Sequence, residues 1–325
     1  MTCTVAVVVP NLNGLEHLPE CFAALDVQSF RDFEVLLIDN GSTDGSAEWM
    51  RENAPACRVL ELGENGGFAK AVNAGIRASD APYVALLNND TNADPRWLAE
   101  LVAALEADPS YDFAASLMLL YDRDGVVNAA GDGYDVARMT GLNRGLGEPE
   151  EGFRERMRVF GACAGAAIYR RSMFDDVGLF DEDFFLLSED TDVNLRALIA
   201  GKRCLYVPAA RVRHKLRATI GVESPEAMKR LTERNEMIVF AKDMPWPLVA
   251  LAPALWLYRQ LRMTVPIRPS KWRRLPELVR DLPKRVVAER EGWRIGWSKR
   301  RSVWSLRRAG TLEIVRWVLR GTGPA

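Results

Sequence analysis

The sequence predicts an α/β protein with a doubly wound, mostly parallel sheet flanked by helices and a basic helical extension at the C-terminus. Stretches of helical periodicity separate four short apolar runs, at residues 4–9, 33–38, 59–62 and 83–87. This alternation builds βαβ units, whose parallel strands bring their loops together at one edge of the sheet. Each run ends in a polar or glycine-rich segment, so we expect a ligand site at that edge.

The composition excludes a disordered or fibrous protein. The chain has 325 residues, of which 48% are hydrophobic and 27% are charged, enough for a large core. Its five cysteines are scattered without CxxC spacing, which favours a reducing compartment. We see no signal peptide at the N-terminus and no apolar run of about 20 residues that could span a bilayer. The sequence therefore predicts a cytoplasmic protein.

The fourth apolar run stops abruptly at Asn88, Asn89 and Asp90. A strand buried on both faces would thus deliver a carboxylate to its own C-terminal end. Mg²⁺ and Mn²⁺ prefer oxygen ligands, and Mg²⁺ usually takes only one or two protein carboxylates together with phosphates and water. We expect Asp90 to bind such a cation beside a diphosphate, although these three residues could also simply turn the chain.

Two other loops indicate a nucleotide. Asp39 follows its strand as an acidic residue does when it binds a ribose hydroxyl or a base N–H. Gly66 and Gly67 allow close backbone approach and precede a helix N-terminus, where free N–H groups favour anions. The chain lacks GxGxxG and GxxxxGK[ST], which weakens dinucleotide-cofactor and P-loop interpretations. Turn chemistry explains any one loop, but the loops together favour a nucleotide.

A second chemical centre lies at Glu189, Asp190 and Asp192, at the start of a helix expected over residues 191–200. Carboxylates there could merely complement the helix dipole. The aromatic-rich run before them would instead desolvate a carboxylate and raise its pKa, as a general base needs. His214 follows a later strand downstream of this cluster, whereas His17 on an early helix is expected to be structural.

Three local expectations concern the neighbouring segments. Asp94 and Pro95 are typical of an N-cap and a first helical position. Residues 131–151 are rich in glycine and charge and predict a mobile loop over the site. Residues 203–207 predict an edge strand that ends at Pro208.

Five segments, in this order, match a known family. They are residues 7–13 (VVVPNLN), 38–46 (IDNGSTDGS), 65–69 (NGGFA), 87–90 (LNND) and 188–192 (SEDTD), the last with Arg196 and Gly201. Each segment alone is weak, but the combination is specific. The chain resembles the family 2 inverting glycosyltransferases of the GT-A fold, and most of all the bacterial rhamnosyltransferase-type branch that builds cell-surface polysaccharides.

The resemblance implies a role for each matching residue. Asp90 would bind the metal, with Asn88 in place of the first aspartate of the family's DxD-like signature and His214 contacting the metal or diphosphate. Asp190 would deprotonate the acceptor hydroxyl, with Glu189 as its neighbour or reserve. The nucleotide-sugar site would include Pro10, Asn11, Asn13, Asp39, Asn65, Gly66, Gly67, Asn88 and Asn89.

The implied function is transfer of a sugar from a nucleoside-diphosphate sugar to a hydroxyl of a glycan or a lipid-linked acceptor, in one displacement with inversion. A non-catalytic nucleotide-sugar or glycan-binding protein of the same fold is the alternative. A sugar nucleotidyltransferase would need a glycine-rich loop with arginine after the first strand, which residues 11–14 lack.

The C-terminal region differs from the rest in charge. Residues 259–325 contain 18 Lys and Arg against 5 Asp and Glu, whereas residues 1–258 contain 25 against 39. Residues 245–258 carry no charge and include Trp and Tyr of the kind found at membrane interfaces. We expect a catalytic domain over residues 1–242, and over residues 243–325 a basic helical region that attaches peripherally to the inner face of an anionic membrane.

Two alternatives for this region stay open. It could be a helical subdomain with a solvated basic face, or it could form a homodimer interface. Charge alone would also allow nucleic acid, but no motif supports it, and nucleic acid is not expected as a partner.

Overall fold

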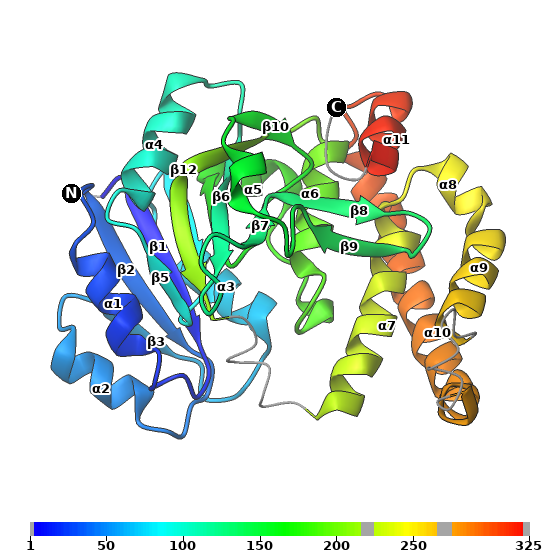
Figure 1. Cartoon of the computed structure of the whole chain (residues 1–325), viewed down its shortest axis with the longest axis horizontal. Coiled ribbons are helices and arrows are strands. Elements are labelled where there is room, and N and C mark those ends of the chain that lie inside the picture. The colour runs from blue at the N-terminus through cyan, green and yellow to red at the C-terminus, as the bar shows by residue number, and fades with distance from the viewer. Residues whose placement is uncertain (1–2, 216–223, 265–274, 321–325) are drawn as a thin grey trace.

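The computed structural model describes residues 3–215, 224–264 and 275–320. A large sheet with its helices forms one side of the molecule, and the helices that follow residue 224 stand together on the other side (Figure 1).

The first half of the sheet is parallel and doubly wound, as predicted. Strand β1 (Val5–Asn11) lies between β2 (Phe33–Asp39) and β4 (Tyr83–Leu87), and β3 (Arg58–Glu61) pairs with the outer side of β2. Helices α1 (Leu18–Asp26), α2 (Ser46–Asn53) and α3 (Phe68–Arg77) connect these strands. The ends of β1, β2 and β4 therefore meet at one edge.

Both faces of this sheet are buried, which explains the continuous apolar runs. In β1, Val5, Val7 and Val9 pack into the cluster that includes α1 and α4 (Trp97–Ala107). Ala6 and Val8 pack into the opposite cluster, which includes α3 and α5 (Arg171–Val177). Successive strand residues point to opposite faces, so each layer needs apolar residues at alternate positions.

The second half of the sheet is mixed. Strand β11 (Ala166–Arg170) pairs antiparallel with both β4 and β6 (Phe113–Leu120), and β12 (Cys204–His214) pairs parallel with β6. Short strands β5 (Thr91–Ala93), β7 (Val127–Ala130) and β10 (Met157–Val159) pair antiparallel with β12, β6 and β12. The pairing of β7 with β6 adds a further antiparallel strand beside residues 113–120.

The prediction of an edge strand ending at Pro208 is wrong. Strand β12 continues to His214 through a register shift between Val207 and Arg211, which accommodates the proline within the strand. It is also covered, because β10 pairs with its other side. This continuation places His214 opposite the end of β4.

The predicted cap at Asp94 and Pro95 is also wrong. Helix α4 begins at Trp97, after Arg96. The chain before it is extended because β5 pairs with β12, and the Asp94 N–H donates to the carbonyl oxygen of Arg211 at 3.0 Å. Sheet pairing therefore overrides the local helix signal.

Residues 131–151 do not form a plain loop. They contain a hairpin of β8 (Asp132–Asp135) and β9 (Thr140–Asn143), followed by a 3₁₀ turn that begins at Glu150. Tyr134 and Met139 anchor the hairpin in the cluster formed with the C-terminal helices. These two apolar side chains outweigh the glycine and charge that predicted a loop.

The C-terminal helices pack around α7 (Pro225–Asp243), which is capped by the Ser224 side chain, whose hydroxyl oxygen accepts from the Ala227 N–H. Helix α10 (Leu275–Ser305) lies along α7, and a Cβ at Gly292 would clash with the backbone of Arg234. The remaining helices are α6 (Glu189–Ile199), α8 (Trp246–Ala250), α9 (Ala252–Thr264) and α11 (Thr311–Arg320). None of the helices in the described ranges has both the length and the apolar character needed to cross a bilayer.

Candidate active site

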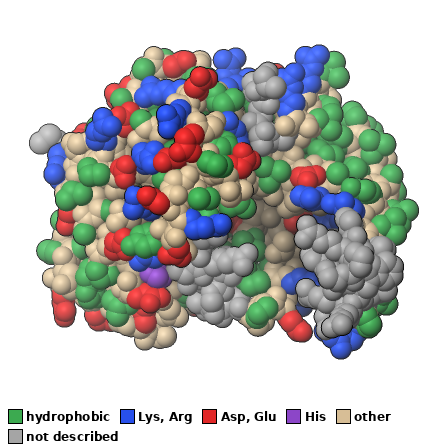
Figure 2. Space-filling model, in the orientation of Figure 1, with side chains coloured by type: hydrophobic (Ala, Val, Ile, Leu, Met, Phe, Trp, Pro, Cys, Tyr) green, Lys and Arg blue, Asp and Glu red, His purple; other side chains and the backbone are tan. Residues whose placement is uncertain are grey.

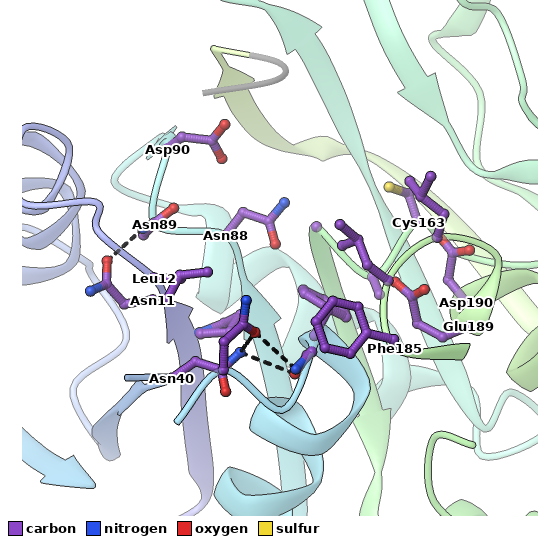
Figure 3. Close-up of a pocket in the computed structure, with 18 of the residues that line it drawn as sticks. Asn11, Leu12, Asn40, Asn88, Asn89, Asp90, Cys163, Phe185, Glu189 and Asp190 are labelled. Atoms are coloured by element: carbon purple, nitrogen blue, oxygen red, sulfur yellow. Dashed lines mark hydrogen bonds between the residues drawn. The ribbon is translucent and has the colours of Figure 1, made fainter. Parts of the chain in front are cut away.

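A cavity of about 220 Å³ opens at the edge where β1 and β4 end (Figure 3). Its walls come from these strand ends, from the start of α3, from residues before β11 and from the start of α6. Most of the predicted site residues line it: Pro10, Asn11, Asn65, Gly67, Asn88, Asn89, Asp90, Glu189, Asp190 and His214. Asn13, Asp39 and Gly66 do not line it.

One end of the cavity holds Asp90 and His214. Asp90 Oδ1 lies 3.1 Å from His214 Nε2, and both side chains are buried. Burial by itself would raise the pKa of Asp90, but the hydrogen bond and charge of His214 outweigh it and hold the pKa below its usual value. His214 Nδ1 lies 2.8 Å from Asn128 Oδ1, which fixes the orientation of the ring.

This pair fits a divalent cation. When His214 gives up its Nε2 proton and keeps Nδ1–H donating to Asn128, Nε2 presents a lone pair beside the Asp90 carboxylate oxygen, and a cation between these two acceptors would take the place of the proton. Within the described residues, no group of three or more His, Cys, Asp and Glu side chains is placed to hold a metal ion. A cation bound by Asp90 and His214 would therefore complete its shell with phosphate oxygens and water.

Asp39 lies one layer behind the cavity wall. Its carboxylate accepts hydrogen bonds from the N–H groups of Gly41 and Ser42 at 3.2 and 2.9 Å, and from Asn11 Nδ2 at 3.3 Å. Asn11 Oδ1 in turn accepts from Asn89 Nδ2 at 2.6 Å. A chain of side chains thus joins Asp39 to the segment that ends in Asp90.

Asn13 belongs to the same loop, although it does not line the cavity. Its backbone adopts a left-handed conformation with φ +49°, and its Oδ1 accepts from the N–H of Thr43 at 2.8 Å. Its own N–H donates to Ser42 Oγ at 2.9 Å. Asn13 therefore ties the loop after β1 to the loop after β2.

Asn40 lines the cavity, and the sequence reasoning did not single it out. Its Nδ2 donates to Asn65 Oδ1 at 3.1 Å and to the Gly67 carbonyl oxygen at 3.2 Å, while its Oδ1 accepts from Gly66 N–H at 3.0 Å. These contacts fix the glycine loop (Figure 3). Gly66 therefore acts through the shape of the loop, whereas Gly67 reaches the cavity.

Glu189 and Asp190, at the first turn of α6, line the cavity on the side across from Asp90 (Figure 3). Burial, followed by the charge of Asp190, raises the pKa of Glu189 to about 8. Burial also raises the pKa of Asp190, against the lowering effect of backbone hydrogen bonds from Thr191 and Ala164. Two buried carboxyl groups with raised pKa at a cavity wall suit proton transfer.

Asp192 has a different environment from its two neighbours. Its carboxylate accepts from Arg196 Nε at 2.9 Å and lies 2.5 Å from Lys242 Nζ. Burial would raise the pKa of Asp192, but the charges of Arg196 and Lys242 outweigh it and lower the pKa. Asp192 is therefore a structural ion-pair partner that joins α6 to α7.

Asp132 on the hairpin is a further buried carboxyl group that the sequence reasoning missed. Its Oδ2 accepts from Asn194 Nδ2 at 3.1 Å. Burial and the charge of Asp190 raise the pKa of Asp132 well above its usual value. The sequence predicts a loop at this position, whereas the hairpin places Asp132 close enough to Asp190 for their charges to interact.

The segment before α6 has an unusual backbone. Phe185, Leu187 and Ser188 all have positive φ, at 62°, 73° and 69°. Such conformations cost free energy for residues with a Cβ, so something must hold them. Asn235 on α7 does so: its Nδ2 lies 2.9, 2.9 and 2.8 Å from the carbonyl oxygens of residues 184, 186 and 187.

This segment joins the two ends of the cavity. Phe185, Leu186 and Leu187 line the cavity wall, and Gly67 packs so closely on Phe185 that a Cβ would clash with its carbonyl oxygen. The arrangement can therefore hold a bound molecule between a cation-binding end and a proton-accepting end.

Comparison with known proteins identifies the family. A family model described as glycosyl transferase family 2 matches residues 6–178, which is more than half of the chain. The chain belongs to glycosyl transferase family 2. The cavity thus lies within and just beyond the matched family 2 region, since α6 and β12 follow it.

A curated relative from Mycobacterium tuberculosis, N-acetylglucosaminyl-diphospho-decaprenol L-rhamnosyltransferase, is 32% identical over 235 residues. The match covers 66% of this chain and 76% of that protein. The predicted likeness to the rhamnosyltransferase-type branch is confirmed.

Solved structures share the fold of this glycosyltransferase. GalNAc-T7 with UDP, GalNAc and Mn²⁺ aligns with a TM-score of 0.60 at 17% identity, covering 88% of this chain and 58% of that chain. The mannosyltransferase PcManGT from Pyrobaculum calidifontis, in complex with GDP-Man and Mn²⁺, aligns with a TM-score of 0.53 at 16% identity, covering 98% and 88%. These structures confirm the predicted GT-A fold.

Proposed function

We propose that this glycosyltransferase uses a divalent cation and transfers a hexosyl or deoxyhexosyl group, with inversion, from a nucleoside-diphosphate sugar to an acceptor hydroxyl. The single observation that supports this most is the cavity itself. Asp90 with His214 and Asp190 with Glu189 line opposite sides of it, as a displacement at a sugar carbon between them requires.

The donor would lie along the strand ends. Asp39, behind the wall, would bind the base or ribose after the hydrogen bonds within its own loop rearrange. Asn11 and the Gly67 backbone would contact the nucleotide between its base and the N-terminus of α3, where N–H groups favour phosphate. Asp90 and His214 would hold the cation, Mg²⁺ or Mn²⁺, whose positive charge would stabilise the leaving diphosphate.

Asp190 would act as the base. The acceptor oxygen forms a bond to the anomeric carbon as the bond from that carbon to the diphosphate oxygen breaks, and Asp190 takes the hydroxyl proton. Its raised pKa makes the ionised carboxylate a stronger proton acceptor. Glu189, with a pKa of about 8, would remain protonated at pH 7 and so leave Asp190 as the ionised member of the pair.

The acceptor class is proposed from the M. tuberculosis relative. The name of that protein describes a deoxyhexose, L-rhamnose, and an acceptor in which a sugar is joined to decaprenol through a diphosphate. We infer that this glycosyltransferase also acts on a glycan or lipid-linked acceptor, in cell-surface polysaccharide synthesis. A lipid-linked acceptor and five free cysteines support a site of action at the cytoplasmic face of the membrane.

A panel of nucleotide sugars tests the donor. Thermal unfolding of the wild type is measured with each nucleotide sugar and Mn²⁺ or Mg²⁺. The correct donor at a hundredfold its Kd should stabilise the fold by about 2.7 kcal/mol. Donor turnover is then followed with the same compound. Binding without any turnover would favour a non-catalytic nucleotide-sugar-binding protein instead.

Two variants test the assigned roles. Asp190→Asn should lower kcat by roughly a hundredfold or more while donor affinity stays within a few-fold of the wild type. Asp90→Ala should weaken donor binding in Mn²⁺ but not in EDTA. Asp80→Asn, at an exposed carboxylate, is the control for both. Near-normal turnover by Asp190→Asn would show that the base is another residue.

A further inference from the structure

Helix α9 buries polar side chains in its second half, after Ala252, Leu255 and Trp256 have packed against the apolar core. Arg259 and Gln260 are buried, Arg259 pairs with Glu236 on α7, and Gln260 Nε2 lies 2.9 Å from both carboxylate oxygens of Glu289 on α10. Trp256 Nε1 also donates to Glu289 at 2.9 Å. These charged and polar contacts fix which face of α9 points outward.

The outward face of α9 is apolar. Leu257 and Leu261 are 55% and 53% exposed, and Tyr258 beside them is also exposed. Trp246 and Leu251, at the two ends of α8, are 60% and 54% exposed. Figure 2 shows hydrophobic side chains gathered along the right edge, where Figure 1 has α8 and α9.

A helix on the surface of a globular protein usually turns its apolar stripe to the core, whereas the second half of α9 buries Arg259 and Gln260 and leaves three large apolar side chains outward. Turning the apolar face inward would break the contacts of α9 to Glu236 and Glu289, so these contacts hold that face outward. A contiguous exposed apolar face of this kind marks an interaction surface. We call the exposed apolar side chains of this region the α8–α9 face; they are Trp246, Leu251, Leu257, Tyr258 and Leu261.

Basic residues border this face on α10. Trp246 of α8 lies 6.3 Å from Trp297 of α10 between ring centroids, and the Arg300 guanidinium lies 5.8 Å from both rings. Arg294 and Arg290, about one and two turns before Trp297, are exposed. Tryptophan and arginine beside an apolar face are the composition of an interfacial membrane segment.

We propose that the α8–α9 face, with its basic border on α10, lies in the surface of an anionic lipid bilayer. Charge decides between lipid and a second copy of the chain. A symmetric dimer through this face would bring two like-charged regions together, since residues 259–325 contain 18 Lys and Arg against 5 Asp and Glu. Anionic headgroups complement the same charge.

Vesicle flotation tests this, with vesicles of phosphatidylcholine alone and of phosphatidylcholine with an equal part of phosphatidylglycerol. The full chain is compared with Leu257→Glu/Leu261→Glu. The matched control is Val27→Glu/Leu146→Glu, two positions that are 55% and 56% exposed away from the α8–α9 face. Thermal unfolding of each variant checks that it is folded. The assay contains no sugar donor, so its outcome is independent of the proposed transfer reaction.

The wild type and the control should float with the anionic vesicles. The Leu257→Glu/Leu261→Glu variant should bind at least tenfold more weakly, and Arg290→Glu/Arg294→Glu should lose roughly fivefold or more for each cation removed, an effect that added salt reduces. Equal flotation of Leu257→Glu/Leu261→Glu and the wild type would overturn the proposal. So would a wild type that does not float but forms a dimer that this variant dissociates.

Discussion

Asn235 should control the rate of transfer without contacting the cavity. In Asn235→Leu, an apolar side chain of similar size replaces the amide that donates to the carbonyl oxygens of Phe184, Leu186 and Leu187. The three left-handed residues of that segment would then be held less firmly. We expect the segment to relax and to move Asp190, which follows it directly.

The magnitude follows from the contacts. The amide has two N–H donors for three carbonyl oxygens, so the variant loses about two net hydrogen bonds and leaves buried acceptors without a donor, which together cost about 2–4 kcal/mol. Each left-handed residue also carries about 1–2 kcal/mol of strain that relaxation would release. If about 1.4–2.8 kcal/mol of this free energy disfavours the conformation that positions Asp190 for proton transfer, kcat falls by roughly ten- to a hundredfold.

The assay is steady-state transfer or donor hydrolysis, together with thermal unfolding. Asn73→Leu is the matched control, because Asn73 is also buried and makes three such bonds, at 2.8 and 2.9 Å to Phe180 and Glu182 and at 3.0 Å from the Phe180 N–H. It should lose similar stability with a smaller loss of kcat. The reasoning would be refuted if Asn235→Leu lowered the melting temperature as Asn73→Leu does but kept wild-type kcat.

Three further predictions concern the two ends of the cavity and the segment between them. Asn128→Leu removes the acceptor that orients His214 and should weaken Mn²⁺ binding by roughly ten- to a hundredfold in a titration, with Asn128→Asp restoring it; unchanged affinity would show that the imidazole does not bind the cation. Because the pKa of Glu189 rises from 4.5 to about 8 on folding, the folded chain holds a proton that the unfolded chain has released, so stability falls as pH rises between those values. Glu189→Gln should remove that fall, so between pH 5 and pH 8 the melting temperature of the variant should drop less than that of the wild type. Parallel profiles of melting temperature against pH would contradict this. Gly67→Ala places a Cβ against Phe185 at a position of positive φ, so it should lower the free energy of unfolding in urea by about 1–2 kcal/mol and also weaken donor binding. Gly147 also has positive φ but has open space around it, so Gly147→Ala should lower stability without changing donor binding.

The half of the site formed by the parallel strands could be predicted from sequence. Apolar runs that end sharply in polar residues place Asn11 and Asp90 at the same edge, because parallel strands in consecutive βαβ units share one direction. The chemistry of Glu189 and Asp190 was likewise visible as carboxylates after an aromatic-rich run.

The remainder depends on contacts between distant segments. His214 reaches Asp90 only because β12 continues past Pro208 beside β6, which local proline chemistry argues against. Asp132 joins the acid centre because Tyr134 and Met139 anchor a hairpin in the C-terminal core. No local pattern marks these pairings.

The α8–α9 region could also be predicted only in part. The charge-free stretch at residues 245–258 predicted contact with a membrane surface, and that stays a prediction. Which face of α9 points outward could not be predicted, because it depends on the pairing of Arg259 and Gln260 with carboxylates on two other helices, Glu236 and Glu289. The predicted domain boundary at residue 242 falls near the end of α7, whose long contact with α10 joins the two parts.

The most direct test of inverting transfer is the configuration of the sugar that the chain first releases from its donor. Proton NMR at early times, before the anomers equilibrate, reports this without knowledge of the acceptor. With Mn²⁺ and a donor found by thermal stabilisation, the wild type should release the inverted anomer, and Asp190→Asn should release none above background. Release of the retained anomer, or equal rates in the two proteins, would contradict a single displacement assisted by Asp190.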